Sequence, residues 1–478
     1  MSTIPLISGA TNVIKITPNS SLIPASFSGI DNLFNFSNLS DSKFSNWKTI
    51  ATSDEKIGVV DGSSGNETHR YIDPDYNISS PEGSLWLLGD AEEDHSFYIQ
   101  TGSNLSKSNS SSTFPDHFNS YGFTESSGNF EDRCGLRNGT PINSITYDRD
   151  CVIGKGVRFN GTASRSRLNT MPYLSGLSNL SILLLTKTPG DVLLFQRAVM
   201  TLQFLSAGGF FACQFSADNL TLVPAGDIPT DSFYLASAVF DGTLDPDERN
   251  KFYVNKVRST PMVSNNTGTL TDVNNVNYGD IGPITGATNN MEIDEARFIN
   301  RSLSSDEIAL RYNQWFDQSN YWTVTVQPVV TSVLKNGDGT FNVRGSGFKP
   351  ESTNPTGTIN GVPFSIQGTV TDNFFVVRSE TGTPIDASQL TVINSDGEQD
   401  TGIIGEVPPT IDEKASPVYL STVGGTRLIN TKYGNPLGNV VDNSAGENPV
   451  EENIKNTNRS GGGGSNLSMY SKPSWLYR

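Results

Sequence analysis

Short apolar strings separated by polar turn residues form the pattern along the first part of the chain. The strings at 13–16, 56–60, 84–88 and 96–99 are divided from one another by Gly, Asp, Asn and Ser. Apolar strings of about four to eight residues between turn signals are typical of β-strands. We therefore predict an N-terminal β-domain over residues 1–110.

From residue 114 onward the alternation becomes more regular. Strand candidates lie at 154–161, 179–186, 233–242 and 251–258. The last of these is interpreted as a hairpin that turns near Asn255 and Lys256. These strands predict a second β-domain over residues 111–325.

One segment has the pattern of a helix. Ser304 is followed three residues later by Glu307, which is the spacing of a capping box. The apolar residues that follow at i, i+4, i+7 and i+8 are Ile308, Tyr312, Trp315 and Phe316. Many short strands with a single helix predict a sandwich architecture.

A third strand-rich segment begins after Trp322. The turn sequence at 336–339 separates two alternating stretches, and further strand candidates follow up to residue 405. We predict a small β-sandwich over residues 326–407. The predicted fold class is thus all-β, with tandem β-sandwiches.

The last part of the chain, residues 408–478, has a different composition. It combines prolines, an acidic stretch and the glycine-rich spacer at 460–465. Because little apolar surface is present to offset the entropy of ordering, we predict an extended C-terminal tail. Its terminal aromatic residues Trp475 and Tyr477 are candidates for docking onto a partner protein, with a plain disordered tail as the alternative.

Composition and charge exclude some classes of function. The chain has 33 basic and 50 acidic residues and a net charge of -17, which would repel nucleic acid. It contains no run of about 18 apolar residues, so membrane insertion is not expected. No basic residue precedes the first apolar patch, so we expect synthesis in the cytoplasm without a secretory signal.

The cysteines, Cys134, Cys151 and Cys213, are expected to be reduced, with a Cys134–Cys151 disulfide as the alternative.

Several of these stretches resemble a known family. The residues at 121–129, 154–161, 252–257 and 293–308 follow the order seen in laminin-G-like, concanavalin-A-like domains. The resemblance implies a two-sheet jelly roll that binds or supports rather than catalyses.

Two further resemblances lie on either side of the laminin-G-like region. Residues 83–87 and 96–100 resemble a β-domain family that often precedes laminin-G-like domains in surface and phage proteins. Residues 345–348 and 391–397 resemble the immunoglobulin-like domains of plexins and transcription factors.

The acidic cluster Glu292, Asp294 and Glu295 is the one candidate for catalysis. Concanavalin-A-like glycosidases of the laminarinase type carry a third carboxylate two or three residues after the aspartate, and here those positions are Ala296 and Arg297. Because adjacent strand residues point to opposite faces, Glu295 does not replace it. We therefore expect no catalytic residues. In the structural interpretation, Glu295 and Arg297 form an exposed ion pair.

The same interpretation places Asp294 on the inward face with Ala296 and Phe298, where its carboxylate would need hydrogen bonds. The three histidines, His69, His95 and His117, have spacings unlike a metal or triad motif, and no cofactor is expected.

Two kinds of binding site stay open at this point. Laminin-G-like folds often hold calcium at a sheet rim, and the candidate ligands are Asp245, Asp247, Asp272 and Asp280. Sugar binding typically uses exposed aromatic rings beside polar groups. The candidates for that role are Tyr173, Tyr278 and Trp322.

Surface-type modules without an export signal predict a structural protein of a tailed bacteriophage virion, as a capsid decoration, fibre or tail adhesion component. Its partners would be other virion proteins and a host-surface polysaccharide, and we expect a homo-oligomer. The alternative is a glycan-binding adhesin or lectin on a cell surface. A divergent glycosidase is the third hypothesis.

Overall fold

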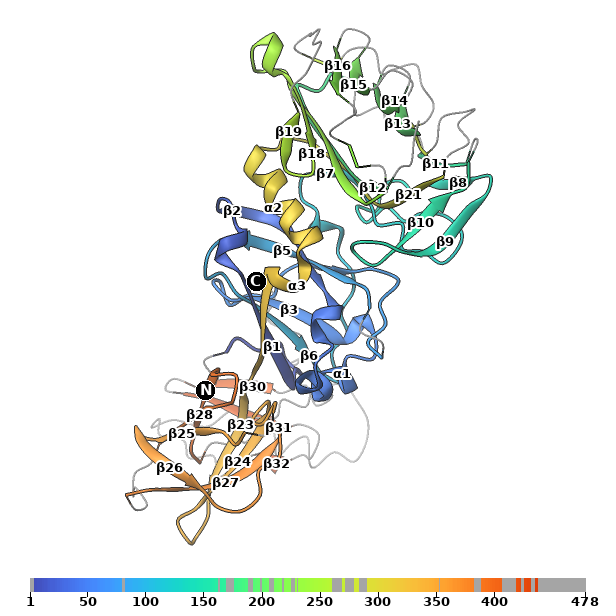
Figure 1. Ribbon diagram of the computed structural model, residues 1–478. Helices are drawn as coiled ribbons and strands as arrows, with labels where there is room; N and C mark the ends of the chain where they lie inside the picture. The colour runs from blue at the N-terminus through green and yellow to red at the C-terminus, as the bar shows by residue number, and fades with distance from the viewer. Residues whose placement is uncertain are drawn as a thin grey trace, which may run out of the picture. The chain divides into compact units, whose positions relative to one another are not determined.

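A computed structural model shows an all-β protein with few helices (Figure 1). It describes residues 4–79, 82–161, 164–168, 176–187, 192–197, 200–205, 210–216, 219–224, 228–229, 231–259, 269–270, 279–282, 290–351, 353–381, 388–405, 418–422, 425–430 and 435–436. The chain divides into two compact units, residues 1–406 and 407–478.

The N-terminal sandwich consists of two antiparallel sheets. Its strands are β1 (Asn12–Pro18), β2 (Phe27–Asn35), β3 (Ile57–Asp61), β4 (Arg70–Ile72), β5 (Ser84–Ala91), β6 (Phe97–Thr101) and β22 (Trp322–Gln327). One sheet has the order β22-β1-β6-β3 and the other has the order β2-β5-β4. Between them lies a core that includes Phe34, Leu85 and Ile99, with helix α1 (Ser45–Ile50) contributing Trp47.

The return of strand β22 to this sheet was not predicted. It pairs antiparallel with β1, with Ile14 opposite Val326 and Pro18 opposite Trp322. Residues 322–325, which we expected to close the second domain, therefore belong to the first sandwich in space.

The central sandwich also has two sheets. Its first sheet has the order β19-β18-β17-β12-β21-β10-β9, with β7 pairing β21, and its second has the order β16-β15-β14-β13-β20-β11-β8. The strands are β7 (His117–Tyr121), β8 (Thr140–Ile142), β9 (Ile145–Asp150), β10 (Lys155–Phe159), β11 (Arg165–Leu168), β12 (Asn179–Lys187), β13 (Val192–Arg197), β14 (Met200–Leu205), β15 (Phe210–Ser216), β16 (Asn219–Pro224), β17 (Tyr234–Asp241), β18 (Asn250–Val254), β19 (Val257–Ser259), β20 (Gly279–Ile281) and β21 (Met291–Ile299). Leu168 and Ile281 from the second sheet pack into one core with residues of the first.

The predicted hairpin and helix are confirmed. Strands β18 and β19 pair around a turn in which Asn255 has a φ of 57°, a left-handed conformation that asparagine tolerates. Helix α2 (Ser305–Phe316) begins after Ser304, whose side chain accepts a hydrogen bond from the backbone N–H of Glu307. A short helix, α3 (Gln318–Tyr321), then leads into β22.

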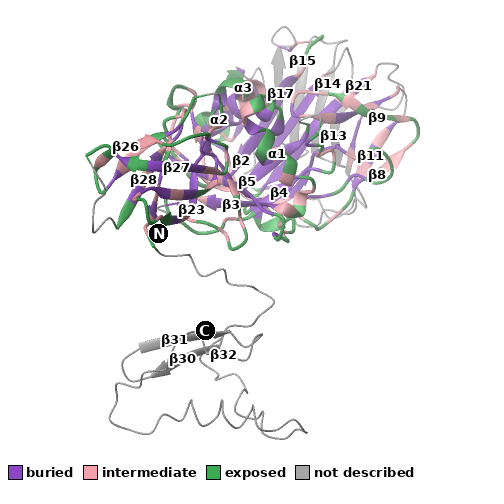
Figure 2. Cartoon of the chain, turned by 90° about the horizontal axis from the view of Figure 1, so that it is seen from below, coloured by how far each residue is buried: buried purple, intermediate pink, exposed green. Residues whose placement is uncertain are grey.

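A second hydrophobic core joins the two sandwiches. Leu33 and Trp86 of the sheet β2-β5-β4 pack with Leu183 and Leu235 of the central sandwich. Trp315 of α2 belongs to the same core, and α2 lies along β2 (Figure 1). Strands β2 and β5 are therefore buried on both faces over much of their length (Figure 2).

The third domain is a single antiparallel sheet of seven strands in the order β23-β24-β27-β26-β25-β28-β29. These are β23 (Val329–Lys335), β24 (Phe341–Ser346), β25 (Thr356–Ile359), β26 (Val362–Ile366), β27 (Phe374–Ser379), β28 (Gln389–Ile393) and β29 (Gln399–Ile403). A bridge between Val333 and Ile404 brings the two ends of the sheet together around a separate core that includes Phe375.

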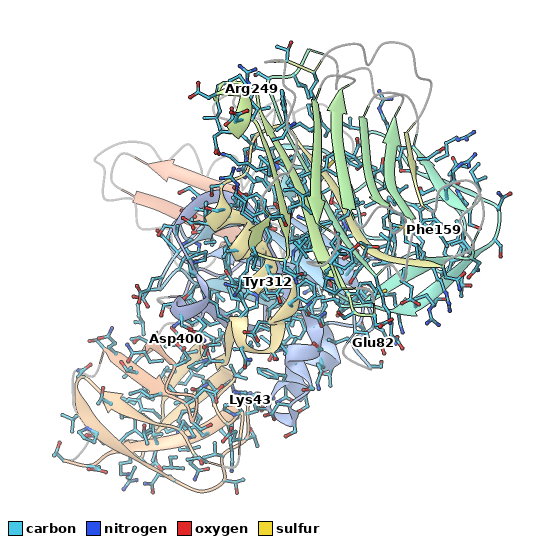
Figure 3. The ribbon with its side chains drawn as sticks, turned by 45° about the horizontal axis from the view of Figure 1, so that its top comes forward. Lys43, Glu82, Phe159, Arg249, Tyr312 and Asp400 are labelled. Carbon is cyan, nitrogen blue, oxygen red and sulfur yellow. The ribbon has the colours of Figure 1, made fainter. Side chains whose placement is uncertain are left out.

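The third domain also contacts the N-terminal sandwich. The carboxylate of Asp396 accepts a hydrogen bond of 2.8 Å from the backbone N–H of Val326 and pairs with Lys43 at 3.2 Å. Figure 3 labels Lys43. Lys15 and Glu398 form a second ion pair at 3.1 Å. The turn after β28, part of the stretch 391–397 that resembles immunoglobulin-like domains, is thus one of the points of attachment, and Asn46 adds a hydrogen bond of 2.7 Å to Asp372.

Where we expected an extended tail, the described residues of the second unit form a small antiparallel sheet. Its strands are β30 (Val418–Thr422), β31 (Gly425–Asn430) and β32 (Asn435–Pro436). The candidate docking residues Trp475 and Tyr477 lie outside the described residues.

Candidate functional site: a buried charged joint on strand β21

The acidic cluster lies on β21, an inner strand of the first sheet of the central sandwich. The register with β12 shifts between Leu185 and Thr186, so that Asp294 is the extra residue of a β-bulge. Because of this shift, Ile293, Ala296 and Phe298 all enter the core of the central sandwich.

The expected hydrogen bonds of Asp294 are present. Its Oδ2 accepts bonds of 2.7 and 2.8 Å from the backbone N–H groups of Val152 and Ile153. Burial raises the pKa of this carboxyl well above its usual value, and these two hydrogen bonds only partly oppose the effect. Asp294 therefore fixes the loop before β10 against β21.

The expected exposed ion pair between Glu295 and Arg297 is wrong. Both residues are fully buried, and Nε of Arg297 lies 3.2 Å from Oε2 of Glu295. The face of β21 that we took as solvent-exposed is covered by the N-terminal sandwich, whose Trp86 ring lies 4.0 Å from the guanidinium of Arg297. The pair thus lies inside the joint between the two sandwiches.

Arg133 is the first of three arginines that connect the two sandwiches at this joint. Its Nε and Nη2 donate to the two oxygens of Asp73 at 2.7 and 2.8 Å, and its Nη1 pairs with Glu295. Asp73 follows β4, so one guanidinium links the N-terminal sandwich to β21. A Cβ at Gly122 would collide with this guanidinium, so a residue without a side chain is required there.

A second set of charges surrounds Asp31 on β2. Arg311 of α2 lies 2.7 Å from its Oδ2, and Arg297 pairs with the same oxygen. Burial alone would raise the pKa of Asp31, but Arg311 and Arg297 outweigh burial and hold it well below the usual range. Arg311 also pairs with Glu307, which connects the start of α2 to the network.

His117 lies beside the same carboxylate, with its Nε2 3.8 Å from Oδ1 of Asp31. Burial lowers the pKa of His117 to about 3. The negative charge of Asp31 opposes this shift, whereas the positive charges of the neighbouring arginines add to it. The ring is therefore neutral at physiological pH, and the charged groups around Asp31 are carboxylates and arginines.

The remaining member of the acidic cluster is near the surface. Glu292 pairs with Arg149 at 3.1 Å, where the Arg149 side chain is 42% exposed. Thus each of the three carboxylates has a structural partner, and the cluster holds strands together.

Of the sugar-binding candidates, the structure describes Trp322. Trp322 is buried in the N-terminal core, and its indole N–H donates to the backbone carbonyl of Leu33 at 2.6 Å. The expectation of an exposed ring at this position is wrong, because pairing of β22 with β1 turns the ring inward. Tyr173 and Tyr278 lie outside the described residues.

The calcium candidates do not form a cluster where they are described. Asp245 and Asp247 are exposed around a short 3-10 turn, whereas Asp280 pairs with Arg165 and Arg167 at 3.1 and 3.2 Å. The carboxylate of Asp280 is thus paired with two guanidinium groups. Asp272 lies outside the described residues.

Sequence reasoning missed one group of side chains whose positions would allow them to hold a metal ion. Asp90, Glu92 and His95, at the end of β5 and in the turn that follows, place one donor atom each within 4.8 Å of one another. The signal was present as the sequence at 90–95, DAEEDH, although the spacing of the three histidines does not by itself indicate a metal site.

Cys134 and Cys151 are free thiols, and burial raises the pKa of both. The side chain of Cys213 is outside the described part of β15. No described helix is long and apolar enough to cross a membrane.

Comparisons with known proteins give only distant structural likenesses. No family model and no curated protein sequence matches the chain. Trypanosoma rangeli sialidase is similar at 12% identity and a TM-score of 0.31, covering 48% of this chain and 42% of the sialidase.

Two toxin domains are comparable. Botulinum neurotoxin type C, in a structure concerned with cell entry through two ganglioside molecules, matches at 9% identity and a TM-score of 0.31, covering 62% of this chain and 96% of its own. The binding domain of Paraclostridial Mosquitocidal Protein 1 matches at 10% identity and a TM-score of 0.35, covering 58% of this chain and 77% of the toxin chain. TM-scores of this size establish neither a common fold nor a common ligand.

Proposed function

We propose that the protein is a non-enzymatic binding protein in which the N-terminal sandwich is a rigid support for the central sandwich, and that the central sandwich binds a surface glycan. One observation is the basis for describing the N-terminal sandwich as a rigid support. The two sandwiches share a hydrophobic core, and Arg133, Arg297 and Arg311 each join a residue of one sandwich to a residue of the other or of α2.

The absence of catalysis in this proposal is supported by the contacts of the acidic cluster. Glycoside hydrolysis needs a carboxylic acid and a carboxylate that both face the substrate. Asp294 and Glu295 are buried within protein contacts, and Glu292 is paired with Arg149. Nucleophilic and acid–base roles would require these contacts to break first.

The glycan as ligand is supported by the laminin-G-like pattern of the sequence and by the two-sheet form of the central sandwich. We further propose that the protein works as a component of a tailed phage particle that meets a host-surface polysaccharide. Mass spectrometry of purified particles tests this part, and absence of the chain from such particles would contradict it.

A glycan array probed with the full chain tests the binding function. Replacing Tyr173 or Tyr278 with Ser should weaken binding to the polysaccharide that the array identifies. The matched control is Leu136→Ser, since Leu136 is 63% exposed on the same sandwich and is not a candidate. Failure to bind any bacterial surface polysaccharide would refute glycan binding. Cleavage that disappears in Glu292→Gln would instead establish a glycosidase.

A further inference from the structure

The turn between β5 and β6 brings metal-binding side chains together at one corner of the N-terminal sandwich. It connects the sheet β2-β5-β4 to the sheet β22-β1-β6-β3. Asp90 and Glu92 are half-buried there, while the side chain of His95 is fully buried. One oxygen of each carboxylate and one ring nitrogen of His95 lie within 4.8 Å of one another.

The orientation of the His95 ring suits metal binding. Its Nε2 lies 3.0 Å from Oδ2 of Asp61, and its Nδ1 lies 3.7 Å from Oε1 of Glu92. Since Asp61 accepts but does not donate as a carboxylate, the ring proton is favoured on Nε2, and the lone pair of Nδ1 faces Glu92. A histidine that binds a metal through one nitrogen commonly directs its other N–H at a carboxylate in this way.

The surrounding contacts hold the ring and its carboxylate in place. Phe97 packs edge-on against the imidazole with ring centres 4.7 Å apart. Asp61 is fixed through Oδ1, which accepts hydrogen bonds of 2.9 and 2.8 Å from the backbone N–H groups of Ser63 and Ser64. The hydroxyl of Ser63 lies 3.0 Å from Nδ1 of His95, where it can interact with the ring before a metal enters.

A second observation concerns the other ring nitrogen of His95. The Nε2 atom is buried, yet it has no aligned hydrogen-bond partner among the residues that the structure describes. Buried polar atoms are nearly always satisfied, so an unsatisfied ring nitrogen between carboxylates needs an explanation. A cation on Nδ1 would hold the ring in its present orientation, with Nε2 directed at Oδ2 of Asp61, 3.0 Å away.

We propose that Asp90, Glu92 and His95 bind a divalent first-row transition metal ion, with Zn²⁺ as its preferred occupant, and that the ion fixes the turn between β5 and β6 against the end of β5. An imidazole nitrogen with two carboxylate oxygens suits Zn²⁺, whereas Ca²⁺ prefers oxygen ligands alone. The site is separate from the calcium candidates on the central sandwich. Its role is structural, because binding to the folded state alone stabilises that state.

Calorimetric titration of the chelator-treated full chain with ZnCl2, with CaCl2 in parallel, tests the proposal. We expect one Zn²⁺ per chain and a higher melting temperature with Zn²⁺ present. Glu92→Gln should lower the affinity by at least about tenfold, since even orienting contacts around a metal contribute about 10–100-fold. Glu92 is only half-buried, so this variant is expected to fold even where His95→Gln does not.

Two matched controls complete the test. Glu93→Gln changes an exposed neighbour, and His69→Gln removes an exposed histidine, so both should bind Zn²⁺ like the unmodified chain. Three outcomes would overturn the proposal: no Zn²⁺ binding, binding unaffected by Glu92→Gln, or preference for Ca²⁺. The first would leave His95 as an ion-pair partner of Asp61 and Glu92 alone.

Discussion

Replacing Arg133 with Met would test the charged joint most severely, because this guanidinium neutralises two buried carboxylates. Asp73 would retain only the hydrogen bond from the indole of Trp86, at 3.0 Å, and Glu295 would retain only its contact with Arg297. Removing one partner of a buried ion pair typically costs about 3–5 kcal/mol, since an uncompensated charge is left behind. We expect a loss in the free energy of unfolding of that size.

Urea unfolding of the full chain, followed by tryptophan fluorescence, measures this loss. Trp86 is a suitable reporter, because its ring lies 5.0 Å from the guanidinium of Arg133. The matched control is Arg149→Met, which breaks the partly exposed pair with Glu292 and should cost no more than about 1 kcal/mol. The double variant Arg133→Met/Glu295→Gln should lose less than the sum of its single variants.

A loss for Arg133→Met that matches the small loss for Arg149→Met would refute the reasoning. It would mean that the joint opens to water, so that the two carboxylates are solvated without their arginine.

Other predictions follow from single buried groups. Burial beside Asp73 raises the pKa of Asp75 to about 7, so the folded state binds more protons than the unfolded state between about pH 4 and 7. The stability that Asp75 contributes is therefore full below about pH 4 and is lost as pH rises through 7. Asp75→Asn should flatten this part of a melting-temperature profile and raise stability at pH 8 by roughly 1–3 kcal/mol; an unchanged profile would contradict the assignment. Trp322→Ala should cost about 3–5 kcal/mol by leaving a cavity, and a loss of glycan binding without a loss of stability would contradict its burial. Asp396→Ala should free Lys43 and make the segment around residue 328 more sensitive to limited proteolysis; unchanged cleavage would show that the third domain is held by other contacts.

Features with local causes could be predicted from the sequence. Helix α2 follows from a serine cap and a repeat of apolar residues, both contained within 13 residues of chain, 304–316. The turn at Asn255 follows from two neighbouring residues between alternating strands. These signals do not depend on which segments pack against the element, so the predicted helix and turn are also found in the folded protein.

Features that depend on distant segments could not be predicted. The alternation along β21 suggests one buried face, but β2 and β5 come from more than 200 residues earlier and cover the other face. Glu295 and Arg297 resembled surface residues, because their partners Arg133 and Asp31 lie 162 and 266 residues away in the sequence. The same holds for Trp322, whose inward orientation requires pairing with β1.

Hydrogen exchange with mass spectrometry, at increasing urea concentration, tests most directly whether the N-terminal and central sandwiches form one cooperative body. Peptides that cover β2 (Phe27–Asn35) and β21 (Met291–Ile299) report on the two sides of the joint. We predict that both exchange through the same opening, with equal free energies and equal dependence on urea. Exchange of β2 through a separate, lower-energy opening while β21 stays protected would contradict the proposed rigid support.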